Sequence, residues 1–102
     1  MKIALINKVK SDINLREIIF DNGTLLLLEK QDDIYEISVS LDFRNISHKT
    51  LSKIADISVA LAFLIRELKE PLLYDEAKSG KVNIYMEIDK DKMDKYIGGL
   101  EL

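Results

Sequence analysis

Few side chains in this sequence have the type and spacing that catalysis requires. His48 is the only histidine, and Asp42 and Arg44 lie near it in the chain. A histidine can act as a general base, but no nucleophile and carboxylate are spaced to form a triad with it. We therefore interpret His48 as a solvated residue at the start of a helix. We predict that the protein is not an enzyme and has no catalytic residue.

A short acidic segment near the C-terminus has some features of a calcium loop. Asp89, Asp91 and Asp94 alternate with lysines. An EF-hand loop needs an oxygen ligand at position five, glycine at six and glutamate at twelve. Met93, Asp94 and Leu100 stand there instead. The chain also has no cysteine, which excludes disulfides and thiolate metal sites. We predict no metal and no cofactor.

Tyrosines are the side chains best suited to contact a nucleic acid or a small ligand. Tyr35, Tyr85 and Tyr96 would serve as stacking platforms for unpaired bases. Acids interleave with the neighbouring lysines, however, and the formal net charge is −3, so no basic field attracts phosphates. A nucleic-acid or small-ligand binding module that uses the tyrosine-bearing strands is therefore the alternative interpretation. Carboxylates at the turns around Asp32-Asp33 and Asp75-Glu76 would suit a small inhibitor that mimics a nucleic acid, although the net charge is weak for that role.

One segment, residues 50–69, predicts a long amphipathic helix around which the other elements are arranged. Ser47 or Thr50 is suited to cap its start, because a side-chain hydroxyl accepts from the free N–H groups of the first turn. Pro71 ends the helix. Its apolar stripe repeats at steps of three and four residues and consists of Leu51, Ile54, Leu61, Ile65 and Leu68, interrupted by Ser58 and widened by Ile57 and Leu64.

Two apolar residues interrupt the polar side of this helix. Val59 and Phe63 lie one turn apart, and every residue from Val59 to Ile65 is apolar. A helix with apolar residues all round has a neighbour on both sides. That neighbour is either another segment of this chain, such as the one after Pro71, or a partner, which would be a second copy or a different protein.

The remaining sequence predicts a mainly antiparallel sheet. Residues 34–43 alternate strictly between apolar and polar side chains, as in a strand with one solvated face. Asn22-Gly23 indicates a hairpin with a two-residue turn. The predicted strands are residues 2–9, 16–20, 24–30, 34–43 and 81–89, with short helices at 72–79 and 90–97.

The predicted hairpin register decides which side chains face the helix. If Asn22 and Gly23 form the turn, Ile18 faces Leu27, and Lys30 pairs with Ile34 after the next turn. The face toward the helix would then hold Ile18, Phe20, Leu25, Leu27, Tyr35, Ile37, Val39 and Leu41. The opposite face would expose Ile19, Leu26 and Leu28 as a second contact surface. A slip of one residue would exchange the two faces of a strand.

Together these patterns predict one α+β domain over residues 1–102. We expect two layers, with about four to five strands on one long helix and one or two short helices. No apolar run approaches the ~20 residues of a membrane span, and the first residues lack a signal-peptide pattern, so we expect a cytoplasmic protein. The leading interpretation is a small interaction protein of the inhibitor, antitoxin-like or adaptor type, which binds another protein or itself as a homodimer. Its contacts would come from Val59, Phe63, Ile19, Leu26 and Leu28.

Overall fold

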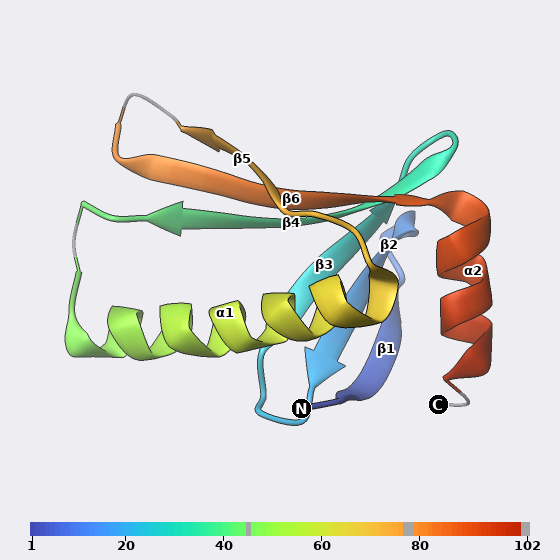
Figure 1. Ribbon diagram of the computed structural model, residues 1–102, viewed down its shortest axis with the longest axis horizontal. Helices are drawn as coiled ribbons and strands as arrows, with labels where there is room; N and C mark the ends of the chain where they lie inside the picture. The colour runs from blue at the N-terminus through green and yellow to red at the C-terminus, as the bar shows by residue number, and fades with distance from the viewer. Residues whose placement is uncertain (45, 77–78, 101–102) are drawn as a thin grey trace.

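The computed structural model describes residues 1–44, 46–76 and 79–100, which form six strands and two helices. Figure 1 shows one long helix and one short helix beside a twisted sheet. In chain order the elements are β1 (Ile3–Val9), β2 (Asp12–Phe20), β3 (Leu25–Lys30), β4 (Ile34–Asp42), α1 (His48–Leu68), β5 (Leu73–Glu76), β6 (Lys81–Asp89) and α2 (Lys90–Gly99).

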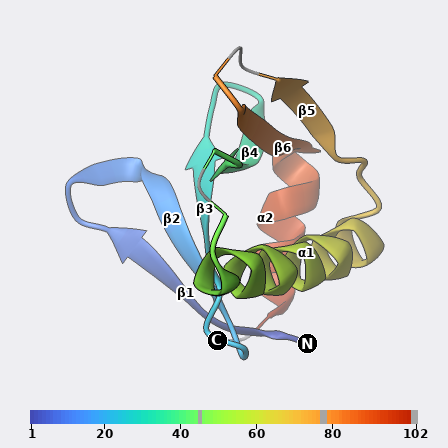
Figure 2. The same ribbon diagram turned by 90° about the vertical axis from the view of Figure 1, so that its left-hand side faces the viewer.

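The strands form a single antiparallel sheet in the order β1-β2-β3-β4-β6-β5. Both helices lie on the same side of this sheet, as the two views in Figures 1 and 2 show. The α+β class and the mainly antiparallel sheet are thus as predicted. The sheet has six strands rather than four or five, because a segment expected to be helical is the edge strand β5.

Helix α1 begins and ends with local hydrogen bonds. Ser47 is the N-cap, and its side-chain oxygen accepts from the backbone N–H of Thr50 at 3.2 Å. Lys69 ends the helix in the left-handed region at φ 55°, and its N–H donates to the carbonyl of Ile65. Neither helix of the described residues combines the length and the apolar character needed to cross a membrane.

The predicted hairpin register was wrong by one residue. Phe20 N–H donates to the carbonyl of Thr24 at 2.9 Å, so the loop has three residues, with Gly23 at φ 86°. A three-residue loop with glycine in the left-handed region is the next common hairpin after the two-residue type. As a result Ile18 faces Leu26 instead of Leu27.

The register between β3 and β4 is also one residue away from the prediction. Lys30 pairs with Tyr35, and Gln31 N–H donates to the carbonyl of Ile34 at 2.8 Å across a two-residue turn. The two differences shift β3 against both neighbours. The side chains of β2 and β4 therefore lie on their predicted faces of the sheet. Those of β3 lie on the opposite faces from the ones predicted.

One hydrophobic core joins the inner face of the sheet to both helices. Leu64 of α1 and Met93 of α2 are fully buried against it. A fully buried aliphatic side chain contributes about 1.5–3 kcal/mol relative to an exposed one. The core side chains are Ile3, Ile18, Phe20, Leu26, Leu28, Tyr35, Ile37, Ala60, Leu61, Leu64, Leu68, Met86, Ile88 and Met93.

Helix α2 has a capped start and several polar contacts with the rest of the chain, among them the Lys92 amine 2.8 Å from the Glu70 carboxylate. The Asp89 carboxylate caps it by accepting from Lys92 N–H at 3.2 Å. The Tyr35 hydroxyl donates to Asp94 at 2.7 Å. This helix was predicted over residues 90–97, and it continues to Gly99.

The helix predicted over residues 72–79 is wrong where the structure describes it. Leu73–Glu76 is strand β5, which pairs with β6 at the sheet edge. A helix of these few residues would gain little beyond the unfavourable first turn, whereas the open edge of β6 offers the segment a ladder of hydrogen-bond partners. Residues 77 and 78 of the predicted helix lie outside the described residues.

Candidate functional site

The sheet face turned away from the helices carries exposed apolar side chains on its first three strands. Leu5, Ile19 and Leu25 are direct cross-strand neighbours on β1, β2 and β3. Leu27 lies on the same face, two residues further along β3. Leu5, Leu25 and Leu27 are 43%, 45% and 40% exposed, and Ile19 is half-buried. We call these four residues the outer patch.

Beside the outer patch the same face becomes acidic. Glu29, Glu36 and Glu87 are consecutive neighbours across β3, β4 and β6. Glu17 pairs with Leu27 and so borders the patch itself. Directly opposite like charges destabilise a sheet, so this row carries a cost within the isolated chain. A partner with positive charges would remove that cost.

Tyr85 lies on the acidic part of this face. It pairs with Ser38 on one side and with Leu73 on the other. Asp75 raises the pKa of Tyr85, with further contributions from burial and from Glu87 and Glu36. The carboxylates that raise this pKa would also repel phosphates. The ring is therefore poorly placed as a stacking platform for a nucleic acid.

The structure separates the three sheet residues predicted to bind a partner. Ile19 lies on the outer face, as predicted. Leu26 and Leu28 are 2% and 0% exposed and face the helices, so their predicted exposure is wrong because β3 is shifted by one residue. Their neighbours Leu25 and Leu27 take the outer positions.

The two helix residues predicted to bind a partner differ in how far they are exposed to solvent. Val59 is 50% exposed. Phe63 is half-buried and packs edge-on against Phe20, with the ring centroids 6.0 Å apart and the planes at 85°. The Arg66 guanidinium lies 5.9 Å from the centre of the Phe63 ring. This chain itself therefore covers part of Phe63, through Phe20 of β2.

Sequence reasoning missed Leu5, Leu25 and Leu27 as surface residues. For the two β3 leucines, the signal was the length of the hairpin loop. A three-residue loop at Asp21-Asn22-Gly23 shifts β3 by one residue and so turns Leu25 and Leu27 to the outer face. For Leu5, the signal would have been a β-bulge in β1. The pairing shifts between Ile3 and Leu5, and no sequence motif marks that shift.

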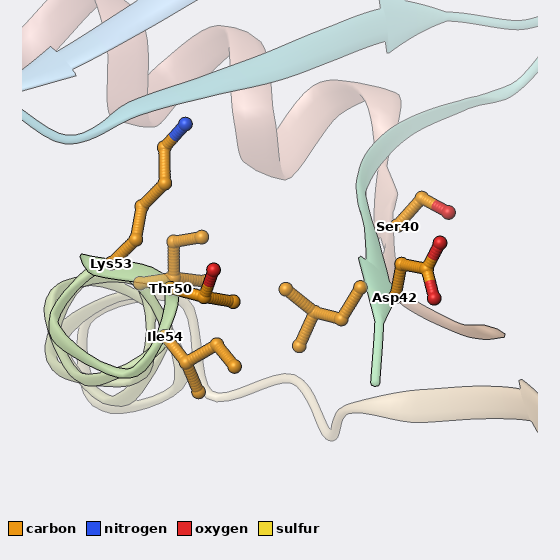
Figure 3. Close-up of a pocket in the computed structure, with 7 residues that line it drawn as sticks. Ser40, Asp42, Thr50, Lys53 and Ile54 are labelled. Atoms are coloured by element: carbon orange, nitrogen blue, oxygen red, sulfur yellow. The ribbon is translucent and has the colours of Figure 1, made fainter. Parts of the chain in front are cut away.

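A pocket of about 370 Å³ lies between β4 and the N-terminal half of α1 (Figure 3). Its lining includes Ile54 and Lys53 of the helix, while Ser40 and Asp42 point away from α1 on the far side of β4. The Asp42 carboxylate is engaged by Arg44 at 2.6 Å, and this hydrogen bonding lowers the pKa of Asp42 to about 2. Lys53 makes no ion pair with any described residue. The lining thus combines three apolar side chains with four polar ones, two of which point away from the helix, and we assign it no catalytic role.

The other residues singled out for chemistry have structural positions. His48 is exposed in the first turn of α1, and no described residue forms a hydrogen bond with its side chain. Asp89 caps α2, and Asp94 binds Tyr35 and lies 3.3 Å from the Lys90 amine. These contacts lower the pKa of Asp94, chiefly through the Tyr35 hydroxyl. Within residues 1–44, 46–76 and 79–100, no group of histidine and acidic side chains is arranged to hold a metal ion.

Comparison with known proteins adds no relative: no family model, no curated protein and no solved structure matches this chain.

Proposed function

We propose that this chain is a small non-enzymatic interaction domain, of the inhibitor or adaptor type, that binds another protein through the outer face of its sheet. The observation that carries the proposal is the outer patch. Three leucines that are 40–45% exposed lie on β1 and β3 of one sheet face, and the half-buried Ile19 of β2 lies between them. Single exposed apolar residues are common, but contiguous ones mark contact surfaces.

The exposed area of the chain supports a surface that a partner covers. A compact monomer of 11.7 kDa exposes about 5,900 Å², whereas this chain exposes 6926 Å². The radius of gyration is 13.9 Å, against about 12.8 Å for a compact domain of 102 residues. The chain thus exposes about 1,000 Å² more than a compact monomer of its mass.

Charge indicates the chemistry of the partner. An apolar centre would cover the outer patch, and lysines or arginines at its rim would face Glu17 and the row of Glu29, Glu36 and Glu87. Pairs of this kind mainly set specificity and association rate. The same carboxylates disfavour nucleic acids and anionic lipid surfaces.

Affinity capture from cells that produce the chain tests this proposal. The bait is the tagged chain, compared with Leu27→Asp, which places a charge in the outer patch. Lys95→Asp is the matched control, because it introduces the same residue at an exposed position of α2. We expect wild type and Lys95→Asp to retain the same protein, released by salt, and Leu27→Asp to lose it while keeping its circular dichroism spectrum. Equal capture by all three would overturn the assignment of this surface.

A further inference from the structure

The hydrophobic core does not reach the N-terminal half of α1. All the buried residues of this helix lie between Ala60 and Leu68, and none lies between His48 and Val59. Figure 1 shows this half of α1 beside β4 and β6. A helical segment of about twelve residues is marginal in water without tertiary contacts. Apolar contacts on the side that faces the sheet would therefore stabilise it.

The sheet opposite this half of α1 is equally short of cover. The inner sides of β4, β6 and this part of the helix carry six aliphatic side chains that are only half-buried: Val39, Leu41, Ile54, Ile57, Val82 and Ile84. In the part of the chain that the structure describes, Leu41, Ile54 and Val82 lie outside the core and its packed neighbours. An aliphatic side chain stabilises a fold only to the extent that it leaves water. This end of the interior is therefore apolar but incompletely filled.

The cavity of about 370 Å³ between β4 and α1 lies in this region. In Figure 3, Ile54 extends from α1 on the side of β4, whereas Ser40 and Asp42 point away from the helix. The apolar walls of the cavity are Leu41, Ile54 and Ile57. Small-molecule sites in proteins have volumes of about 300–1,000 Å³ and mainly apolar walls. The cavity is thus large enough to hold a small ligand.

A lysine amine stands at the rim of this cavity. Lys53 is exposed and makes no ion pair with any described residue. Asp42, the other charged residue of the lining, is engaged by Arg44. Lys53 also borders a second cavity, near the Asn22-Gly23 loop, but there Asp56 lines the same cavity. An anionic group is therefore best placed at the first cavity, where Lys53 is the charged side chain that is left for a ligand.

We propose that the cavity between β4 and α1 binds an aliphatic carboxylate. Its hydrocarbon chain lies against Leu41, Ile54 and Ile57, and its carboxylate meets the Lys53 amine at the rim. Binding removes apolar surface of both the walls and the ligand from water, which supplies the free energy. The ligand also provides the apolar contacts that the N-terminal half of α1 lacks. The site lies on the helix side of the sheet, opposite the outer patch, so it does not depend on what binds there.

Titration of the isotope-labelled chain with butanoate, hexanoate, octanoate and decanoate, each below its micelle concentration, tests the proposal by NMR. We expect the amide signals of Leu41, Thr50, Ile54 and Ile57 to shift. The affinity should rise by up to about fourfold for each added CH₂ that enters the cavity. An affinity that does not depend on chain length, or shifts confined to other parts of the chain, would overturn the proposal.

Two lysine variants test the place of the carboxylate. Lys53→Met keeps the apolar stem and removes the amine, whereas Lys49→Met makes the same change at an exposed residue of α1 that lines neither cavity. Because an ion pair in solvent is weak, we expect Lys53→Met to bind octanoate about two- to fivefold more weakly than wild type. Lys49→Met should bind it like wild type, and uncharged octanol should bind all three chains alike. No loss in Lys53→Met, or an equal loss in both variants, would remove Lys53 from the site.

Two further measurements distinguish this site from other surfaces. Leu27→Asp, which alters the outer patch, should bind octanoate like wild type, and a loss in this variant would place the ligand on the wrong face. Spectra of wild type without ligand, recorded at rising chain concentration, test whether a second copy covers the cavity. We expect the signals of Leu41 and Ile54 to stay in place. Concentration-dependent shifts at these residues would overturn the assignment of the cavity to a carboxylate.

Discussion

Leucines 27 and 28 provide a matched test of which face of β3 lies against the helices. The two residues are adjacent and chemically identical, yet Leu28 is fully buried and Leu27 is 40% exposed. Replacing a fully buried leucine by alanine costs about 2–5 kcal/mol, through lost burial and the cavity left behind. The same change at a largely exposed site costs about 0.5 kcal/mol. We expect Leu28→Ala to destabilise the chain by about 3 kcal/mol and Leu27→Ala by much less.

Thermal unfolding followed by circular dichroism measures this difference. In a domain of this size each kcal/mol shifts Tm by about 4–8 °C, so Leu28→Ala should lower Tm by roughly 12–24 °C. Leu27→Ala should lower it by only about 2–4 °C. All three chains are compared at one concentration and in one buffer. A larger loss in Leu27→Ala than in Leu28→Ala would refute the register of β3, and with it the outer patch.

Three further predictions follow from individual contacts. Asp75→Asn should lower the pKa of Tyr85 toward 10.0, since Asp75 is the main cause of its increase. The absorbance of tyrosinate during an alkaline titration measures this pKa. An unchanged titration would contradict the placement of Asp75. Asp42 should titrate near pH 2 by carbon-13 NMR, compared with an ordinary 3.8, and Arg44→Gln should restore a higher value. Because the folded pKa of Asp42 is lowered, its contribution to stability is present above pH 3.8 and is lost as the pH falls through about 2, so an NMR midpoint near 3.8 in the wild type would argue against this pair. Phe63→Ala should destabilise the chain by about 2 kcal/mol in urea unfolding, less than for a fully buried ring but including the edge-on aromatic contact; no loss would mean that the ring is not packed against β2.

Elements with a distinct periodicity were predictable from the sequence. The alternation of β4 placed Tyr35 and Ile37 in the core, and the spacing in α1 identified the helix with Ser47 as one of two candidate caps. In both cases one arrangement buries the apolar residues and exposes the charged ones. The hydrophobic pattern alone therefore determines which side faces the core.

Strand β3 could not be oriented in this way. Its sequence runs Leu25-Leu26-Leu27-Leu28, so either register buries two leucines and exposes two. The hydrophobic gain is the same in both, and the choice depends on the loop at Asn22-Gly23, where two-residue and three-residue hairpins are both allowed. The prediction therefore placed Leu26 and Leu28 on the outer face, where the structure has Leu25 and Leu27.

Strand β5 shows a different limit. Pro71 and Gly80 suggested a short helix between them, because these residues often bracket one. The backbone of Leu73–Glu76 instead pairs with β6, a partner that follows it in the chain. Such tertiary pairing overrides the local preference of a four-residue segment. No pattern within the segment itself predicts this pairing.

Photo-crosslinking from defined positions tests the central claim, that the outer patch of the sheet binds a foreign protein. A benzophenone amino acid would replace Leu27 in the outer patch and, as a control, Lys95 on α2, in cells that produce the chain. We predict that the Leu27 probe links the chain to one discrete protein of another sequence, identified by mass spectrometry, and that the Lys95 probe does not. If the Leu27 probe gives no adduct, or the same adducts as Lys95, the outer patch is not the contact surface and the proposed function is wrong.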